Sequence, residues 1–271
     1  MKIKVIIENL TKNPNMKFEH GLSIYIEVYD RKYIFDFGKS GKFIENAKSL
    51  GINMEDIDCG VLSHGHYDHG GGLQNFMDSN RKAKVYMKPE HMNNHYCLTE
   101  DKQSYIGINK EILPLYTHRI VAVEGKTQIE ENVYVIEAKG NKTCTLGKDL
   151  RLKKLIGQKF LEDDFQDEIM LIIEENQELT VFTGCSHNGI VNMINKVTAE
   201  FPNKGIKRAI GGFHLIGNKD MENVDNLAKE LLNCPVEKFY TCHCTDYKNY
   251  EILKNIMGSR IEYISTGDII E

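Results

Sequence analysis

The chain has 271 residues, of which 41% are hydrophobic and 27% are charged, and its formal net charge is -5. A chain of this length can bury a large core without metals or disulfides, so a metal site would be catalytic rather than structural. The acidic balance argues against nucleic acid as a partner. No apolar run reaches the ~20 residues of a membrane span, and the start MKIKVIIENL lacks a signal-peptide core. We expect a cytoplasmic protein with reduced cysteines and no membrane partner. Its oligomeric state is unknown.

The first quarter of the chain predicts strands followed by one helix. Residues 3–7, 22–29 and 33–37 are rich in apolar and β-branched residues, which is typical of strands. Phe43, Ile44, Ala47 and Leu50 recur at helical spacing, with Ser40 as the expected N-cap and Gly51 as the residue that ends the helix. A short strand at 59–62 follows.

The middle of the chain, from about 90 to 165, mixes turn residues with short strand-like pieces. We expect this range to be an insertion that caps the site. Its histidines, His91, His95 and His118, are expected to be surface or cap residues.

The second half alternates between strands and helices. Residues 169–173 and 179–182 predict a hairpin, and helical spacing then alternates with strands at 206–210, 236–240 and 261–264. Strands first, followed by alternating helices and strands, fit an α/β sandwich of two sheets flanked by helices. We expect residues 1–271 to form one domain.

The run SHGHYDHGGG follows the strand at 59–62 and carries the strongest chemical signal. His64 and His66, two apart on an extended segment, project to the same side. Asp68 and His69 come at the next turn, where three glycines allow tight folding. Three imidazoles and one carboxylate within six residues are costly to place together without a cation. These donors suit zinc, iron and manganese.

The run HGHYDHGGG resembles the signature of the metallo-β-lactamase superfamily. The upstream FDFG is similar to the family's strand beside the metal loop, where the residue equivalent to Asp36 supports the ligands. The segments GCSHNGIVN, GGFHL and CHCT resemble a subfamily of metal-dependent hydrolases and of synthases that join a dihydropterin to ribofuranosylaminobenzene 5′-phosphate. The resemblance implies an αββα sandwich of the metallo-β-lactamase type, with two mixed β-sheets flanked by helices, and a dinuclear site for two divalent transition metals. Zinc is favoured, with manganese and iron as alternatives.

The resemblance also implies further ligands from later strands. His187 takes the place of the third histidine of the family. Cys185 stands where the family usually has a bridging aspartate, and it is either a metal ligand or a buried thiol beside the site. Asp167, Glu168 and Asp268 are less favoured candidates for the bridge.

His214 and His243 follow predicted strands, at the carboxyl ends where α/β sheets present functional groups. The family resemblance favours His243 as the last metal ligand. His214 is expected to be a proton donor or a phosphate contact. Cys242 and Cys244 are expected to flank His243 without facing the metals, and His20 is expected near the site by resemblance to the subfamily.

These residues imply a metal-dependent hydrolase that uses a metal-activated water on a phosphorylated or ester-like small molecule. Asp68 would orient or deprotonate the nucleophile, and the helix that starts near Gly189 would add a positive field for an anionic substrate. The alternatives are a transferase similar to the dihydropterin synthase, an iron redox enzyme on the same scaffold, and a metal sensor without catalysis.

Overall fold

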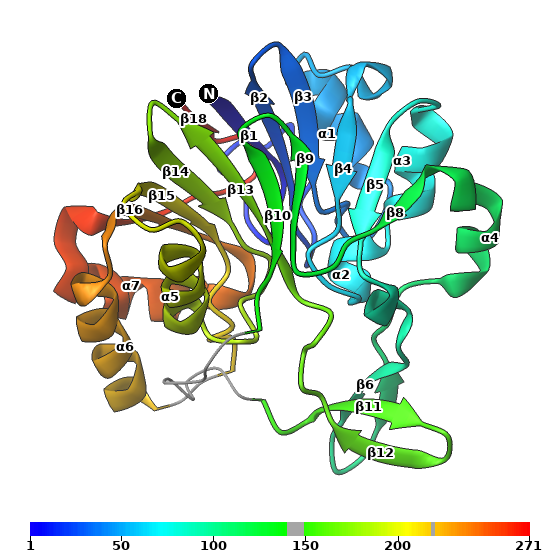
Figure 1. Cartoon of the computed structure of the whole chain (residues 1–271). Coiled ribbons are helices and arrows are strands. Elements are labelled where there is room, and N and C mark those ends of the chain that lie inside the picture. The colour runs from blue at the N-terminus through cyan, green and yellow to red at the C-terminus, as the bar shows by residue number, and fades with distance from the viewer. Residues whose placement is uncertain (140–148, 218–219) are drawn as a thin grey trace. The chain divides into compact units, whose positions relative to one another are not determined.

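The computed structural model describes residues 1–139, 149–217 and 220–271. The chain divides into two compact units. The first comprises Met1–Val123, Asp149–Asp167 and Ser265–Glu271, and the second comprises Glu124–Lys148 and Glu168–Ile264. Each unit contains a mixed sheet and its own helices (Figure 1).

The main sheet of the first unit has seven strands in the order β18-β1-β2-β3-β4-β5-β8. β1, β2 and β3 pair antiparallel, whereas β3, β4, β5 and β8 run parallel. The predicted strands at 3–7, 22–29, 33–37 and 59–62 are all present in this sheet. Its strands are β1 (Lys2–Ile7), β2 (Ser23–Val28), β3 (Arg31–Phe35), β4 (Cys59–Val61), β5 (Lys84–Met87), β8 (Ile120–Ala122) and β18 (Ile269–Ile270).

The helices of the first unit are short. The apolar faces of α1 and α3 pack with the sheet in one core that includes Ile34, Phe43 and Phe76. Ser40 is not the N-cap of α1, because Gly41 holds that position and the Ser40 hydroxyl donates to Glu19 instead. The helices are α1 (Lys42–Ser49), α2 (Tyr67–Gly70), α3 (Leu73–Ser79) and α4 (Leu113–Tyr116).

A second sheet of the first unit has four strands in the order β12-β11-β6-β7. It lies within the range 90–165 that was expected to be an insertion. The rest of that range contributes β8 to the first unit and β9 and β10 to the second, while residues 140–148 lie outside the described residues. The single domain and the capping role stay predictions. The strands are β6 (His95–Leu98), β7 (Gln103–Tyr105), β11 (Leu152–Ile156) and β12 (Lys159–Glu162).

The sheet of the second unit has seven strands in the order β17-β16-β15-β14-β13-β10-β9. The hairpin predicted at 169–182 is present as β13 and β14, and β14, β15, β16 and β17 run parallel. The strands are β9 (Lys126–Glu130), β10 (Val133–Glu137), β13 (Ile169–Glu175), β14 (Glu178–Phe182), β15 (Gly205–Gly211), β16 (Val236–Thr241) and β17 (Ile261–Tyr263).

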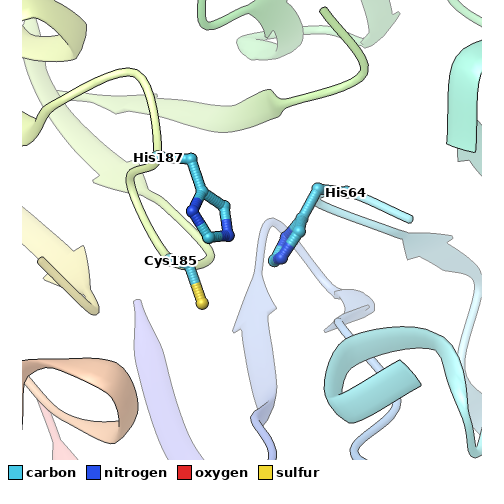
Figure 2. Close-up of side chains that lie close together, drawn as sticks. All are labelled: His64, Cys185 and His187. Carbon is cyan, nitrogen blue, oxygen red and sulfur yellow. The ribbon is translucent and has the colours of Figure 1, made fainter. Parts of the chain in front are cut away.

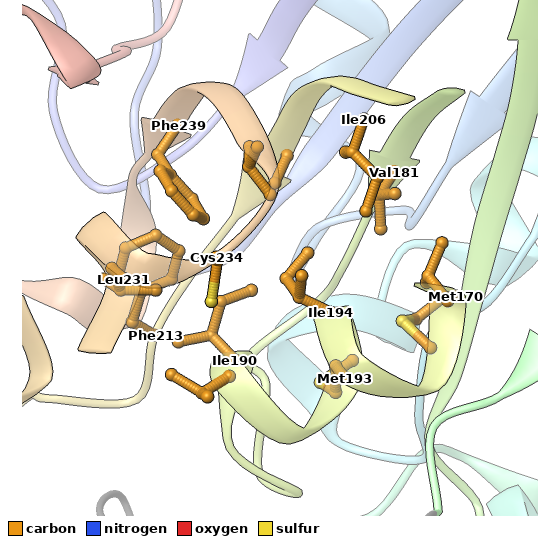
Figure 3. Packing of buried hydrophobic residues seen from close by; sticks show 14 of the residues in the cluster. Met170, Val181, Ile190, Met193, Ile194, Ile206, Phe213, Leu231, Cys234 and Phe239 are labelled. Atoms are coloured by element: carbon orange, nitrogen blue, oxygen red, sulfur yellow. The ribbon is translucent and has the colours of Figure 1, made fainter. Parts of the chain in front are cut away.

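Three longer helices of the second unit pack against this sheet: α5 (Ile190–Glu200), α6 (Met221–Asn233) and α7 (Tyr247–Met257). Figure 3 shows how strand residues such as Val181 and Ile206 meet Ile190 and Ile194 of α5 in one apolar core. In the described part of the chain, no helix has the length and apolarity to cross a membrane.

Shortening one side chain in this core tests how tightly it is packed. Ile194 is fully buried, and Ile194→Val removes one methylene group without adding a polar atom. We expect the free energy of unfolding to fall by about 1 kcal/mol, because a small cavity replaces the lost contacts. Urea denaturation of the two proteins measures the difference. A loss below ~0.3 kcal/mol would show that the core relaxes around the substitution.

Candidate metal centre

In the first unit, the predicted metal-ligand residues lie at the carboxyl ends of parallel strands. β3 and β4 pair in parallel up to Phe35 and Val61. Asp36 therefore follows one strand beside Ser63 and His64, which follow the other. The chain then enters α2, which carries Asp68 and His69. The sheet thus brings the sequence motif and Asp36 to one edge.

The three imidazoles of this first ligand set are buried and close together. His64 Nε2 lies 3.1 Å from His66 Nδ1, and the ring centroids of His64 and His69 are 4.2 Å apart. Burial, together with a smaller contribution from the nearby His95, lowers the pKa of His66 to about 4. The His66 ring is therefore neutral near neutral pH, which is the form of imidazole that binds a metal.

Asp36 fixes two of these rings through hydrogen bonds. Its Oδ2 lies 2.6 Å from His69 Nδ1, and it also accepts the Ser63 hydroxyl, at 2.8 Å. Since that hydroxyl proton goes to Asp36, the Ser63 oxygen accepts from His64 Nδ1, which is 2.9 Å away. Both His64 and His69 therefore keep their lone pair on Nε2. A carboxylate that orients a ligating imidazole in this way is typical of metal sites.

The donor set of the first unit therefore fits a divalent transition metal. Imidazole nitrogens with a fixed tautomer stand beside the carboxylate of Asp68, which is buried. Asp68 Oδ2 lies 3.1 Å from His20 Nε2, and His20 Nδ1 is 3.2 Å from Asn9 Nδ2. His20 therefore lies next to a ligand residue, as the sequence led us to expect.

The glycines of the motif are needed for close approach rather than for unusual dihedral angles. Gly72 has an ordinary negative φ of -85°. A Cβ atom there would lie 2.1 Å from the backbone oxygen of Phe37. The ligand loop therefore packs directly on the backbone that follows β3.

A second group of buried residues in the first unit had no signal in the sequence. His95 was expected to be a surface or cap residue; it is not at the surface but fully buried, and its ring centroid is 5.2 Å from that of His66. Its Nδ1 lies 2.7 Å from Asp163 Oδ2. Although burial opposes it, this hydrogen bond raises the pKa of His95. His91 is also fully buried, with its ring nitrogens near the carbonyl oxygens of Lys88 and Leu62.

In the second unit, the candidate residues follow three neighbouring parallel strands. Phe182 pairs with Ile210, and Ile210 pairs with Tyr240, so β14, β15 and β16 end at the same edge. The segments after these ends carry the candidates, listed in chain order: Cys185, His187, His214 and His243. Figure 2 draws Cys185 and His187 on the loop after β14, together with His64, which follows β4 of the first unit.

The loop after β14 is held by Glu168. Its carboxylate accepts the backbone N–H of His187 at 2.7 Å and that of Asn188 at 2.8 Å. These groups precede α5, whose N-cap is Gly189. Glu168 therefore orders the segment that leads into α5, and the expectation that the start of this helix attracts a substrate anion stays a prediction.

The two later histidines differ in exposure. His243 is fully buried, whereas His214 is only half-buried. The His214 ring packs on that of His187, with centroids 4.2 Å apart. Its accessibility suits a group that meets a substrate, and the burial of His243 suits a metal ligand.

Cys244 lies nearer to the candidate ligands than the sequence indicated. Its ligand atom, that of Cys185 and that of His214 all lie within 4.8 Å of one another. Its sulfur accepts the N–H of His214 at 3.2 Å. Although burial opposes it, hydrogen bonds with Cys185 and His214 hold the pKa of Cys244 well below its usual range. The burial of Cys244 against Gly212 was not visible in the sequence, and the expectation that Cys244 does not face the metals stays a prediction.

The less favoured acidic candidates have other roles in the structure. Asp167 accepts the backbone N–H of Gly65 at 2.8 Å, and Glu168 accepts the amides described above. Asp268 accepts from the backbone N–H and the hydroxyl of Ser265 in a turn.

Comparisons with known proteins agree with this chemistry. The family model of the metallo-beta-lactamase superfamily matches residues 16–243. The chain is 31% identical, over 93% of its length and 90% of the relative's, to the 7,8-dihydropterin-6-methyl-4-(beta-D-ribofuranosyl)-aminobenzene-5'-phosphate synthase of Methanocaldococcus jannaschii. The crystal structure of Tm1679, described as a metal-dependent hydrolase of the beta-lactamase superfamily, superimposes with a TM-score of 0.84 at 28% identity, covering 100% of this chain and 98% of that one.

A more distant structure shows the fold alone. The metallo-beta-lactamase fold protein YhfI of Bacillus subtilis superimposes with a TM-score of 0.58 at 11% identity, covering 99% of this chain and 98% of that one. The predicted fold class, with mixed sheets flanked by helices, is confirmed.

Proposed function

The chain belongs to the metallo-beta-lactamase superfamily, and from that premise we propose that it is a metal-dependent hydrolase of a phosphorylated or ester-like small molecule. One observation carries the proposal. In the first unit, Asp36 and Ser63 fix His64 and His69 so that both keep a lone pair on Nε2, beside the neutral ring of His66. Such an arrangement is costly unless a cation is bound.

We further propose a dinuclear centre for divalent transition metals, with zinc favoured and manganese or iron as alternatives. All of its proposed ligands fall within the range 16–243 that matches the family model. The proposed ligands are His64, His66, Asp68, His69, Cys185, His187 and His243. Imidazole, carboxylate and thiolate are all established zinc ligands.

In this proposal, bound metals would supply a nucleophilic water at neutral pH and would stabilise negative charge on the attacked group. Asp68, which His20 holds in place, would orient the attacking water. His214 is half-buried and can reach a substrate, and an imidazole can donate a proton to a leaving group near neutral pH. These two residues are therefore the proposed catalytic groups.

An anionic substrate is consistent with the charge beside the first ligand set. Lys39 is exposed, and its ammonium lies 5.4 Å from the ring centroid of Tyr67, the residue before Asp68. An exposed cation in this position would attract a phosphate or a carboxylate. The small-molecule substrate itself stays unidentified.

A transferase is the second candidate, and it is favoured by the 31% identity to the synthase of Methanocaldococcus jannaschii. In a reaction of that kind, the same metals would hold a leaving diphosphate. The two candidates differ in their products, because hydrolysis consumes water whereas the transferase joins two organic substrates.

Metal content gives the first test. We expect protein purified without chelators to contain up to two transition-metal ions per chain, because neutral imidazoles beside a carboxylate are a donor set for such ions. Elemental analysis, followed by reconstitution with zinc, manganese and iron, measures this. Stoichiometric binding of none of these metals would refute the proposed centre.

The reaction class is then tested with the reconstituted enzyme. A panel of phosphodiesters, lactones and thioesters tests hydrolysis, and a dihydropterin diphosphate with an aminobenzene acceptor tests transfer. Turnover of the second pair alone would replace the hydrolase by the transferase. Activity that requires iron and an electron acceptor would favour the redox alternative, and metal binding without any turnover would favour a sensor.

A further inference from the structure

Two consecutive buried acids, Asp167 and Glu168, stand at the point where the chain passes from the first unit to the second. Neither carboxylate is explained by the proposed catalytic groups. A buried carboxylate is costly unless it is paired or accepts hydrogen bonds. The partners of these two residues therefore indicate what they are for.

Asp167 holds the backbone between two proposed ligands. Its Oδ2 accepts the N–H of Gly65 at 2.8 Å, and Gly65 lies between His64 and His66. The same oxygen is 3.7 Å from His95 Nε2, a buried atom without a hydrogen bond among the described residues. His95 is in turn bound to Asp163. His95 and Asp163, both from the range 90–165, therefore lie behind the carboxylate that holds the metal loop of their own unit.

Glu168 holds the corresponding loop of the second unit. Its two oxygens accept the N–H of His187, the N–H of Asn188 and the side-chain amide of Asn188, at 2.7, 2.8 and 2.8 Å. Ser186, in the same loop, has a φ of +59°, which is unusual for a residue other than glycine. The carboxylate stabilises this turn because it accepts hydrogen bonds from backbone N–H groups that belong to no helix or strand.

We propose that Asp167 and Glu168 are positioning residues, each of which fixes the backbone of the metal-ligand loop in its own unit. The proposal rests on the proposed metal centre. A charged acceptor makes stronger hydrogen bonds to N–H groups than a neutral one does. If the loops already hold the metal-binding conformation before the metal arrives, less conformational entropy is lost on binding, and the metal binds more tightly.

The test uses carboxylate-to-amide substitutions in the full chain. Asp167→Asn and Glu168→Gln keep the shape of each side chain but remove its charge, and in Glu168→Gln one of the two accepting oxygens becomes an N–H donor that faces other donors. We expect each variant to bind zinc roughly 10–100-fold more weakly, the usual effect of residues that support metal ligands. Competition with a chelator measures the affinity, and the cobalt(II) absorption spectrum reports the ligand geometry, which we expect to change.

The matched control is Glu174→Gln on β13. Glu174 forms an ion pair with Lys204 at 2.6 Å and lies near the end of β13 that is farther along the chain from Glu168. We expect this variant to bind zinc as tightly as the wild-type chain, with the same cobalt spectrum. Should Glu168→Gln fail to fold, Asn188→Ala removes one of the three N–H groups that Glu168 accepts, and we expect a smaller loss of zinc affinity.

Two results would overturn the inference. One is zinc affinity and a cobalt spectrum that stay at the wild-type values in the variants. The other is a lower melting temperature of the metal-free variants with unchanged zinc affinity, which would show a structural role alone. A wild-type chain that binds no metal would instead refute the proposed function.

Discussion

His243→Ala is expected to lose one metal and the enzymatic activity together. His243 follows β16 at the edge where the ligand-bearing segments of the second unit begin, and its side chain is fully buried. A buried imidazole that is replaced by a methyl group leaves the metal one ligand short, and zinc sites seldom tolerate such a loss. Elemental analysis of the purified variant, together with its turnover rate, gives the result.

His214→Ala is the matched comparison, because His214 follows the neighbouring strand β15. We expect this variant to keep both metals but to lose roughly 10²–10⁴-fold in rate, the usual contribution of a general acid. The half-buried side chain can reach a substrate, and its packing on His187 orients it. A reduced rate with a normal metal content is therefore the expected pattern.

The alternative outcome has a structural basis of its own. The ligand atoms of His214, Cys185 and Cys244 form a compact group in the second unit. Loss of metal from His214→Ala, with metal retained in His243→Ala, would exchange the two roles. Cys185→Ser adds a further check. If the Cys185 thiolate binds a metal, its replacement should lower the metal content; if Cys185 is only a buried neighbour, the metal content should not change.

Asp36→Ala is expected to destabilise the fold and the metal site at once. Asp36 is fully buried and bonds to Ser63 and His69. Removing one partner of a buried charged network typically costs about 3–5 kcal/mol. Chemical denaturation of the metal-free protein measures this loss. We also expect zinc affinity to fall roughly 10–100-fold, because His69 loses the group that fixes its tautomer.

Two further variants serve as comparisons for Asp36→Ala: one separates the charge of Asp36 from its backbone conformation, and the other removes an exposed aspartate. Asp36 has a φ of +60°, a conformation that asparagine tolerates better than alanine does. Asp36→Asn therefore removes the charge without adding strain, and it should still weaken zinc binding. Asp56→Asn breaks an exposed ion pair with Lys32, where the expected change in stability is below ~1 kcal/mol. Equal effects at the two positions would contradict the role of Asp36.

Local sequence patterns determined most of the regular elements. The helix at α1 and the alternation from β13 to β17 follow from hydrophobic periodicity, because side chains three or four apart share a helix face. The short strands β5 to β8 were not predicted, since three or four residues give too little periodicity. The motif with His64, His66, Asp68 and His69 was visible for a different reason: its donors lie within six residues.

Only the tertiary structure revealed the residues that support this motif. His95 and Asp163 come from separate strands and loops, and pairing of β6 with β11 brings their segments together. Asp36 was expected beside the metal loop only by family resemblance, and the parallel register of β3 and β4 supplies the physical cause. Cys244 appeared to be a neighbour of His243 alone until the fold buried it beside Cys185 and His214.

The sequence by itself thus determined the family, the metal motif and the elements with strong periodicity, because each is encoded within a short stretch of chain. The tertiary structure decided which distant acids hold the ligand loops, as Asp167 does for Gly65 and Glu168 does for His187. Hydrogen bonds between residues 19 or 102 positions apart leave no periodic pattern in the chain. They arise only when strand pairing and core packing bring the carboxylates and amides within about 3 Å of each other.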